Sequence, residues 1–150
     1  IISFDNDFLA VEKNYQNIKN KNITNVLPLV MDLVNPSSGV GWMNKERGSL
    51  FQRGPCDVSL ALALVHHLAI SNNLHFFQIA DFFAKISKWL IVEFVPKEDV
   101  QIKRMLINTK DIFSEYSVKN FEREFSKLFT IVKKVPVKKQ DRMIYLMKKK

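Results

Sequence analysis

The sequence contains one cysteine and four glycines among its 150 residues. A single cysteine, Cys56, excludes an intrachain disulfide and leaves a zinc site built from several thiolates unsupported. We therefore expect a reducing, cytoplasmic setting and no metal site. All four glycines lie within residues 33–55, a segment without clear periodicity. A loop of this length in a compact domain usually serves function, and its Trp42 and Arg47 could line a substrate pocket.

Long apolar runs are also missing. The longest, residues 60–65, is far too short to cross a bilayer, which requires about 20 apolar residues. No basic segment followed by an apolar one stands at the N-terminus, so we expect neither a signal peptide nor a membrane partner. The sequence instead opens at Ile1 inside an apolar run, which indicates a fragment of a longer protein.

Apolar residues are abundant enough for a core. They make up 47% of the chain and include twelve phenylalanines, so we expect one folded domain over residues 1–150. The net charge of +8 is unevenly placed, because residues 128–150 hold eight Lys or Arg and one acid, Asp141. This basic segment could bind nucleic acid or anionic lipid. The alternative, that its lysines protect a sheet edge, agrees better with its scarcity of Arg and interleaved aromatics.

Strand and helix patterns alternate along most of the chain. Phe8, Val11, Tyr15 and Ile18 recur on one helical face, and Pro28 places its strand at or near a sheet edge. The last two strands have no helix between them and must pair antiparallel. The order predicts an α/β fold with a doubly wound, mostly parallel sheet and a C-terminal antiparallel hairpin. The expected strands are 1–4, 26–31, 58–63, 89–95, 130–135 and 143–147, and helical segments begin near residues 8, 66, 76, 98 and 117.

Acidic side chains stand where several of these strands end. Asp5, Asp32 and Glu93 follow apolar strands, and His66 and His67 come just after another. Ligands of open α/β sheets bind outside the carboxyl ends of the strands. One strand-end acid can accept both hydroxyls of a ribose, and a second can accept an adenine amino group. The pattern favours an adenosine-containing ligand.

Four segments resemble class I S-adenosyl-L-methionine-dependent methyltransferases, which have a Rossmann-like fold. The second strand and helix of that family resemble IISFDNDFLAVEKNY, and the third, fourth and fifth strands resemble VLPLVMDLVNP, CDVSLALALVHHLAI and KWLIVEFVPKED. The closing hairpin is similar to the sixth and seventh strands, of which the seventh is antiparallel. The string DLVNPSSGVGW also resembles nodulation-related methyltransferase-like proteins.

The resemblance implies methyl transfer from S-adenosyl-L-methionine to a nucleophilic acceptor that it does not identify. Asp5, beside Asn6, would bind the cofactor ribose, Asp32 and Leu33 would hold the adenine, and the catalytic candidates His66 and His67 would lie near the methyl donor or the acceptor. The first strand of the family, with its glycine-rich loop, would precede Ile1. We therefore expect a gap in the sheet and weak cofactor binding by this chain alone.

Each candidate acid also has a structural interpretation. Asp5 could cap the first helix, and Asp32 could accept hydrogen bonds from backbone amides. Asp57 begins its strand and is expected to be structural. Glu93 is either a pocket acid or the partner of a lysine, Lys88 or Lys97.

The histidines and the overall function leave alternatives open too. Neighbouring helix positions point in different directions, so at most one of His66 and His67 should face a pocket. That ring could act as a general base or be a buried, hydrogen-bonded side chain. An NAD-dependent oxidoreductase would share the strand-end acid but not the closing hairpin. A noncatalytic binding module would keep the fold without the cofactor.

Overall fold

The computed structural model describes residues 1–107, 112–137 and 141–150. The chain divides into two compact units, residues 1–50 and 51–150, which are considered separately below. Whether the two behave as the one domain that we expect from the length stays a prediction.

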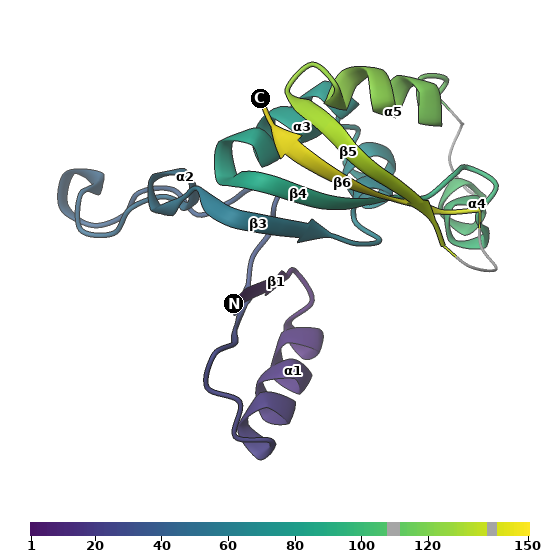
Figure 1. The fold of residues 1–150 in the computed structure, drawn as a ribbon. Coiled ribbons are helices and arrows are strands. Elements are labelled where there is room, and N and C mark those ends of the chain that lie inside the picture. The colour runs from purple at the N-terminus through teal and green to yellow at the C-terminus, as the bar shows by residue number, and fades with distance from the viewer. Residues whose placement is uncertain (108–111, 138–140) are drawn as a thin grey trace. The chain divides into compact units, whose positions relative to one another are not determined.

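The first unit consists of a strand, a helix and a second strand, of which Figure 1 labels β1 and α1. Strand β1 (Ile2–Asp5) leads into helix α1 (Phe8–Asn20), and β2 (Leu27–Val30) pairs with β1 in parallel. Asp7 caps α1, since its carboxylate accepts the Leu9 N–H at 2.8 Å. Among the described residues β2 pairs only with β1, so the edge position predicted from Pro28 is confirmed.

Residues 33–55 are largely irregular, as predicted, but they contain two short helical pieces that periodicity did not show. These are a 3₁₀ turn, η1 (Trp42–Asn44), and α2 (Leu50–Arg53). Val40 and Arg47 form a bridge around η1. Gly41 has a φ of 87°, and a Cβ there would lie 2.4 Å from that of Glu46, so this tight turn requires glycine.

The second unit is built on a four-stranded sheet in the order β3-β4-β6-β5. Strands β3 (Cys56–Ala61) and β4 (Ser87–Phe94) are parallel, while β6 (Met143–Lys149) is antiparallel to β4 and to β5 (Phe129–Pro136). The last strand is therefore inserted between β4 and β5. The predicted α/β class and closing antiparallel hairpin are confirmed.

Aromatic side chains fill the core of this unit between the sheet and its helices. Helices α3 (Phe76–Ile86) and α5 (Val118–Phe125) pack against each other. Phe121 of α5 is fully buried, with its ring within 5.5 Å of those of Phe76, Phe94 and Tyr145. Ser117 caps α5 as predicted. Two shorter helical segments, the π-helical turn η2 (His67–Ser71) and α4 (Val100–Leu106), complete the unit.

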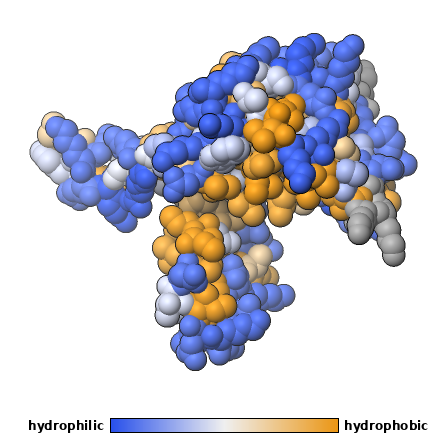
Figure 2. Space-filling view, in the orientation of Figure 1, coloured by the Kyte–Doolittle hydropathy of each residue, from blue (hydrophilic) through white to orange (hydrophobic). Residues whose placement is uncertain are grey.

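The expected gap in the sheet stays a prediction, because the two sheets lie in units that are described separately. No ladder among the described residues joins β1 and β2 to the four-stranded sheet, and β4 is the only described partner of β3. The outer strand β3 carries exposed apolar side chains, with 46% of Val58 and 64% of Leu60 accessible. Apolar side chains gather on the surface of each unit in Figure 2. An unpaired apolar strand is the edge that a further strand would cover.

Candidate functional site

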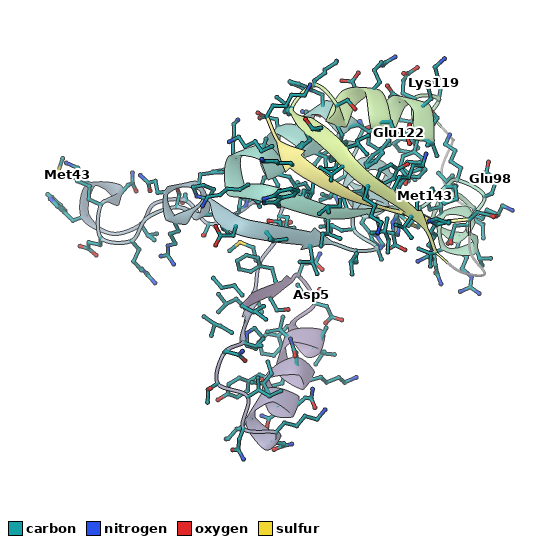
Figure 3. All side chains as sticks on the ribbon, viewed as in Figure 1. Asp5, Met43, Glu98, Lys119, Glu122 and Met143 are labelled. Carbon is teal, nitrogen blue, oxygen red and sulfur yellow. The ribbon has the colours of Figure 1, made fainter. Side chains whose placement is uncertain are left out.

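The first unit brings Asp5 and Asp32 to one edge of its sheet. The Met31 N–H donates to the Asp5 carbonyl at 2.8 Å, so Asp32 follows directly on the neighbouring strand. Both residues lie at the carboxyl ends of parallel strands, and both are exposed. The Asp5 side chain stands free of the strand where β1 ends (Figure 3).

Each of these carboxylates uses one oxygen to hold a backbone turn. Asp5 Oδ1 accepts the Asp7 N–H, and Asp32 Oδ1 accepts the Val34 N–H, both at 2.9 Å. Asp5 is thus not the cap of α1. Asp32 does accept a hydrogen bond from a backbone amide, as its structural interpretation predicted. Neither Oδ2 has a hydrogen-bond partner among the described residues, and each can accept a hydroxyl or amino group.

Asn6 and Leu33, the other predicted cofactor residues, adjoin the two acids. Asn6 is exposed and Leu33 is half-buried. These side chains fit a nucleoside. The two carboxylates can accept hydrogen bonds from ribose hydroxyls and from an amino group, and Leu33 can supply an apolar contact for a base. These four residues would hold the adenosine part of S-adenosyl-L-methionine, which supplies a methyl group on a sulfonium.

The second unit places His66 and His67 together beside a hollow of about 470 Å³. Their ring centroids are 4.2 Å apart. His66 is 3% exposed, and His67 is exposed. Both residues line the hollow, and the expectation that at most one ring faces a bound substrate stays a prediction. The lining residues are Ala63, His66, His67, Gln101, Arg104, Met105 and Arg142.

Burial sets the protonation state of His66. The pKa of His66 is lowered from the ordinary 6.5 to about 4, mainly because burial removes water from the ring and also because His67 and Arg142 are nearby, while Asp99 opposes the shift. The imidazole is neutral at pH 7. Its Nδ1 is buried and has no hydrogen-bond partner among the described residues. The alternative that His66 is a buried, hydrogen-bonded core residue is therefore not supported at Nδ1.

A charged network encloses this hollow. Arg142, which precedes β6, donates from Nε to Asp99 at 2.9 Å and from Nη1 to Glu93 at 3.4 Å. Asp99 also caps α4 by accepting the Gln101 N–H. The Arg142 hydrogen bond holds the pKa of Asp99 below its usual value. The network therefore fixes α4, which carries Gln101 and Arg104 into the lining.

Glu93 also holds the turn that precedes the histidines. Its second oxygen accepts the Ala63 N–H at 2.6 Å, and Ala63 has a left-handed φ of 49°. Left-handed backbone at a non-glycine residue costs free energy and often marks functional sites, as π-helical turns do. Glu93 is thus paired with Arg142 and not with Lys88, which instead contacts Asp57 at 2.8 Å. Asp57 is exposed near the start of β3, and its structural role stays a prediction.

Sequence reasoning missed the residues that complete the hollow. In the sequence Arg142 belongs only to the basic segment, and no pattern singles out Gln101 and Arg104, which line the hollow, or Asp99, which accepts from Arg142. No local pattern announces them, since the Arg142–Asp99 bond joins positions 43 residues apart. The described residues contain no group of three or more His, Cys, Asp or Glu arranged to hold a metal.

Much of the basic segment is engaged within the fold. Lys134 pairs with Glu122 of α5, labelled in Figure 3, and Lys150 donates to the Ser126 carbonyl. The ammonium of Lys148 lies 5.5 Å from the centre of the Trp89 ring. Strand β5 is an edge of the sheet and carries Lys133 and Lys134, an arrangement that agrees with protection of that edge. Lys138 and Lys139 lie outside the described residues.

Comparison with solved structures shows the fold. The chain is similar to WbdD in complex with the kinase inhibitor LY294002 (TM-score 0.62, 11% identity, 99% of this chain and 30% of that one). It is similar to the PH0226 protein of Pyrococcus horikoshii OT3, with a TM-score of 0.60 and 13% identity, over 100% of this chain and 71% of that one. It is also similar to the 16S rRNA methylase ArmA, with a TM-score of 0.55 and 14% identity, over 99% of this chain and 61% of that one. The chain has the fold of class I S-adenosylmethionine-dependent methyltransferases. The Rossmann-like prediction is confirmed.

Sequence comparison shows a closer relationship to one curated protein. The chain is 38% identical over 121 residues to the nodulation protein NoeA of Rhizobium meliloti (strain 1021), a match that covers 81% of this chain. The chain spans 25% of the length of that relative. The resemblance to nodulation-related proteins is confirmed. No protein-family model matches the chain. Within the described residues, no helix is long and apolar enough to span a membrane.

Proposed function

We propose that this chain is part of an S-adenosyl-L-methionine-dependent methyltransferase. The observation that carries the proposal is the placement of Asp5 and Asp32 at adjacent carboxyl ends of parallel strands, in a chain with the methyltransferase fold. Each keeps one carboxylate oxygen for a ligand. In this proposal Asp5 and Asn6 bind the ribose and Asp32 and Leu33 hold the adenine, while His66 and His67 are the catalytic candidates.

The protein's own contribution to this reaction is alignment and the exclusion of water. Methyl transfer from a sulfonium needs an acceptor atom held in line with the methyl group, and positioning of this kind supplies much of the rate. Met105 and the buried His66 are among the residues that line the hollow. The antiparallel strand β6, which lies between β4 and β5, supports a methyltransferase. We expect no closing hairpin of this kind in an NAD-dependent oxidoreductase. A cytoplasmic setting belongs to the same proposal and is supported by the single cysteine.

Binding of S-adenosylhomocysteine by the full-length protein tests the proposal. We expect calorimetry to detect this ligand and not NAD. Asp5→Ala should weaken binding about tenfold, which corresponds to one lost charge-assisted hydrogen bond. Asp57→Ala is the matched control, because Asp57 is an exposed acid at the opposite end of a strand. Binding of NAD in place of S-adenosylhomocysteine would favour the oxidoreductase, and binding of neither would favour a noncatalytic module, to which nucleic acid could bind through the basic segment.

A further inference from the structure

The tip of the long loop, residues 40–47, presents apolar side chains to solvent. Trp42 is 79% exposed and Met43 is 65% exposed, and Met43 lies at the end of the turn (Figure 3). Val40, which begins the tip, is 42% exposed. No aromatic ring or cation of the described residues stacks on the Trp42 indole. Large apolar side chains that are adjacent at one exposed place favour an interaction site, whereas scattered ones need no explanation.

The backbone of the tip is held in one strained form. Val40 and Arg47 exchange N–H to carbonyl hydrogen bonds at 3.0 and 3.1 Å, and the Asn44 N–H donates to the Gly41 carbonyl at 3.0 Å. Met43 and Asn44 both have left-handed φ angles, 55° and 58°. Left-handed backbone at residues other than glycine costs free energy and clusters at functional sites. A turn that is already formed also loses little conformational entropy when a ligand binds.

Two cations adjoin the apolar side chains of the tip. Lys45 and Arg47 are exposed, and neither forms an ion pair with a described residue. Glu46 stands between them in the sequence, but its side chain folds over Gly41. Two cations and one acid give residues 40–47 a net charge of +1. The tip therefore combines an open aromatic ring with cations that can contact an anionic group.

We infer that the tip binds single-stranded nucleic acid, with the Trp42 indole stacked on a base and Lys45 and Arg47 in contact with backbone phosphates. Proteins that bind such strands combine basic side chains along the backbone with aromatic rings on which bases stack. Stacking of this kind tolerates any sequence, since every base has a flat face. The inference goes beyond the proposed methyltransferase function and depends on residues 40–47 alone.

The small size of the tip favours a base over other partners. A stable protein interface buries about 800 Å² on each side. A large aromatic side chain contributes about 150–250 Å², so Trp42 and Met43 together fall well short of that area. Anchoring to a bilayer also takes more apolar surface, since even one myristoyl chain binds only marginally. A single ring is sufficient for one base, because stacking adds affinity base by base.

Fluorine NMR of the full-length protein labelled with fluorotryptophan tests where a strand binds. The probes are oligouridine, oligothymidine and a DNA duplex, and the Trp42 signal is assigned from its loss in Trp42→Phe. We expect both single strands to shift the Trp42 signal. The duplex should leave it unchanged, because its bases are already stacked on one another. Trp89, which lies under Lys148 of the basic segment, reports on the competing site.

Substitutions separate stacking from other contacts. Affinity for oligouridine is measured by fluorescence anisotropy. Trp42→Phe should retain most of the affinity, whereas Trp42→Leu, which is apolar but not flat, should lower it about tenfold. Lys45→Gln should reduce the slope of log affinity against log salt by about 0.7, the value for one phosphate contact on a single strand. Lys13→Gln removes the same charge from an exposed position of α1 and should change neither quantity.

Several results would overturn the inference. They include no shift of the Trp42 signal with either strand, an equal shift with the duplex, and equal affinities of Trp42→Leu and Trp42→Phe. A shift of the Trp89 signal alone would place the strand at the basic segment. A Trp42 shift with phosphatidylglycerol vesicles but not with nucleic acid would indicate a membrane partner instead. Preference for oligouridine or for oligothymidine would support the inference and identify the strand as RNA or DNA.

Discussion

Arg142 Nε donates a hydrogen bond to Asp99 Oδ2 at 2.9 Å, and this bond ties the start of β6 to the first turn of α4. The same guanidinium reaches Glu93 at the end of β4. The side chain of Arg142 thus links the start of β6, the end of β4 and the N-terminus of α4. Loss of the Arg142 charge would leave two largely buried carboxylates without a cation, although each keeps one backbone hydrogen bond.

Arg142→Met should therefore destabilise the protein. The variant keeps much of the side-chain length but leaves Glu93 and Asp99, which are 10% and 15% exposed, without their cation. We expect the free energy of unfolding, measured by urea denaturation, to fall by about 1–3 kcal/mol. Lys88→Met removes a lysine from an exposed pair with Asp57 and should leave stability nearly unchanged. Equal losses of unfolding free energy in the two variants would contradict the idea that the buried Arg142 network stabilises the protein more than the exposed Lys88–Asp57 pair.

Stability should depend on pH through His66. Its pKa is about 4 in the folded protein and 6.5 when unfolded, so the unfolded state binds more protons between these values. Stability is complete above pH 6.5 and is lost as pH falls toward 4, by up to about 3 kcal/mol. His66→Phe should remove this component from urea midpoints measured across the range. An NMR titration in which His66 protonates near pH 6.5 would contradict the depressed pKa.

The strand-end acids could be predicted because the signal is local. A short apolar strand followed by an acid and a helix cap fixes which end of the strand carries Asp5, and the parallel pairing of β1 and β2 then brings Asp32 to the same edge. The closing hairpin could be predicted for a similar reason, since two strands without an intervening helix have one way to pair.

The hollow could not be predicted because its parts come from distant positions. Arg142, Asp99 and Glu93 meet only after the sheet forms. One alternative for Glu93, a pair with Lys88, does not form, for a reason that the sequence does contain. The two residues are five positions apart on one strand and point to opposite faces of the sheet. Lys88 instead meets Asp57 on the neighbouring strand, where Cys56 is aligned with Ser87.

Ala63 offers a test of the strain at the turn before the histidines. Its φ of 49° disfavours a residue with a Cβ, and the bond from its N–H to Glu93 helps to hold it there. Ala63→Gly should raise the free energy of unfolding by up to about 1 kcal/mol, because glycine adopts this conformation freely. The measurement is a urea denaturation of both proteins.

Ala80→Gly provides the matched comparison. Ala80 is buried in the middle of α3, where the same substitution should lower the free energy of unfolding by about 1 kcal/mol or more. Opposite signs at the two positions would locate the strain at Ala63. If Ala63→Gly also destabilised the protein by a similar amount, the turn would be relaxed. Glu93 would then serve to place Arg142 and His66, and not to hold a strained backbone.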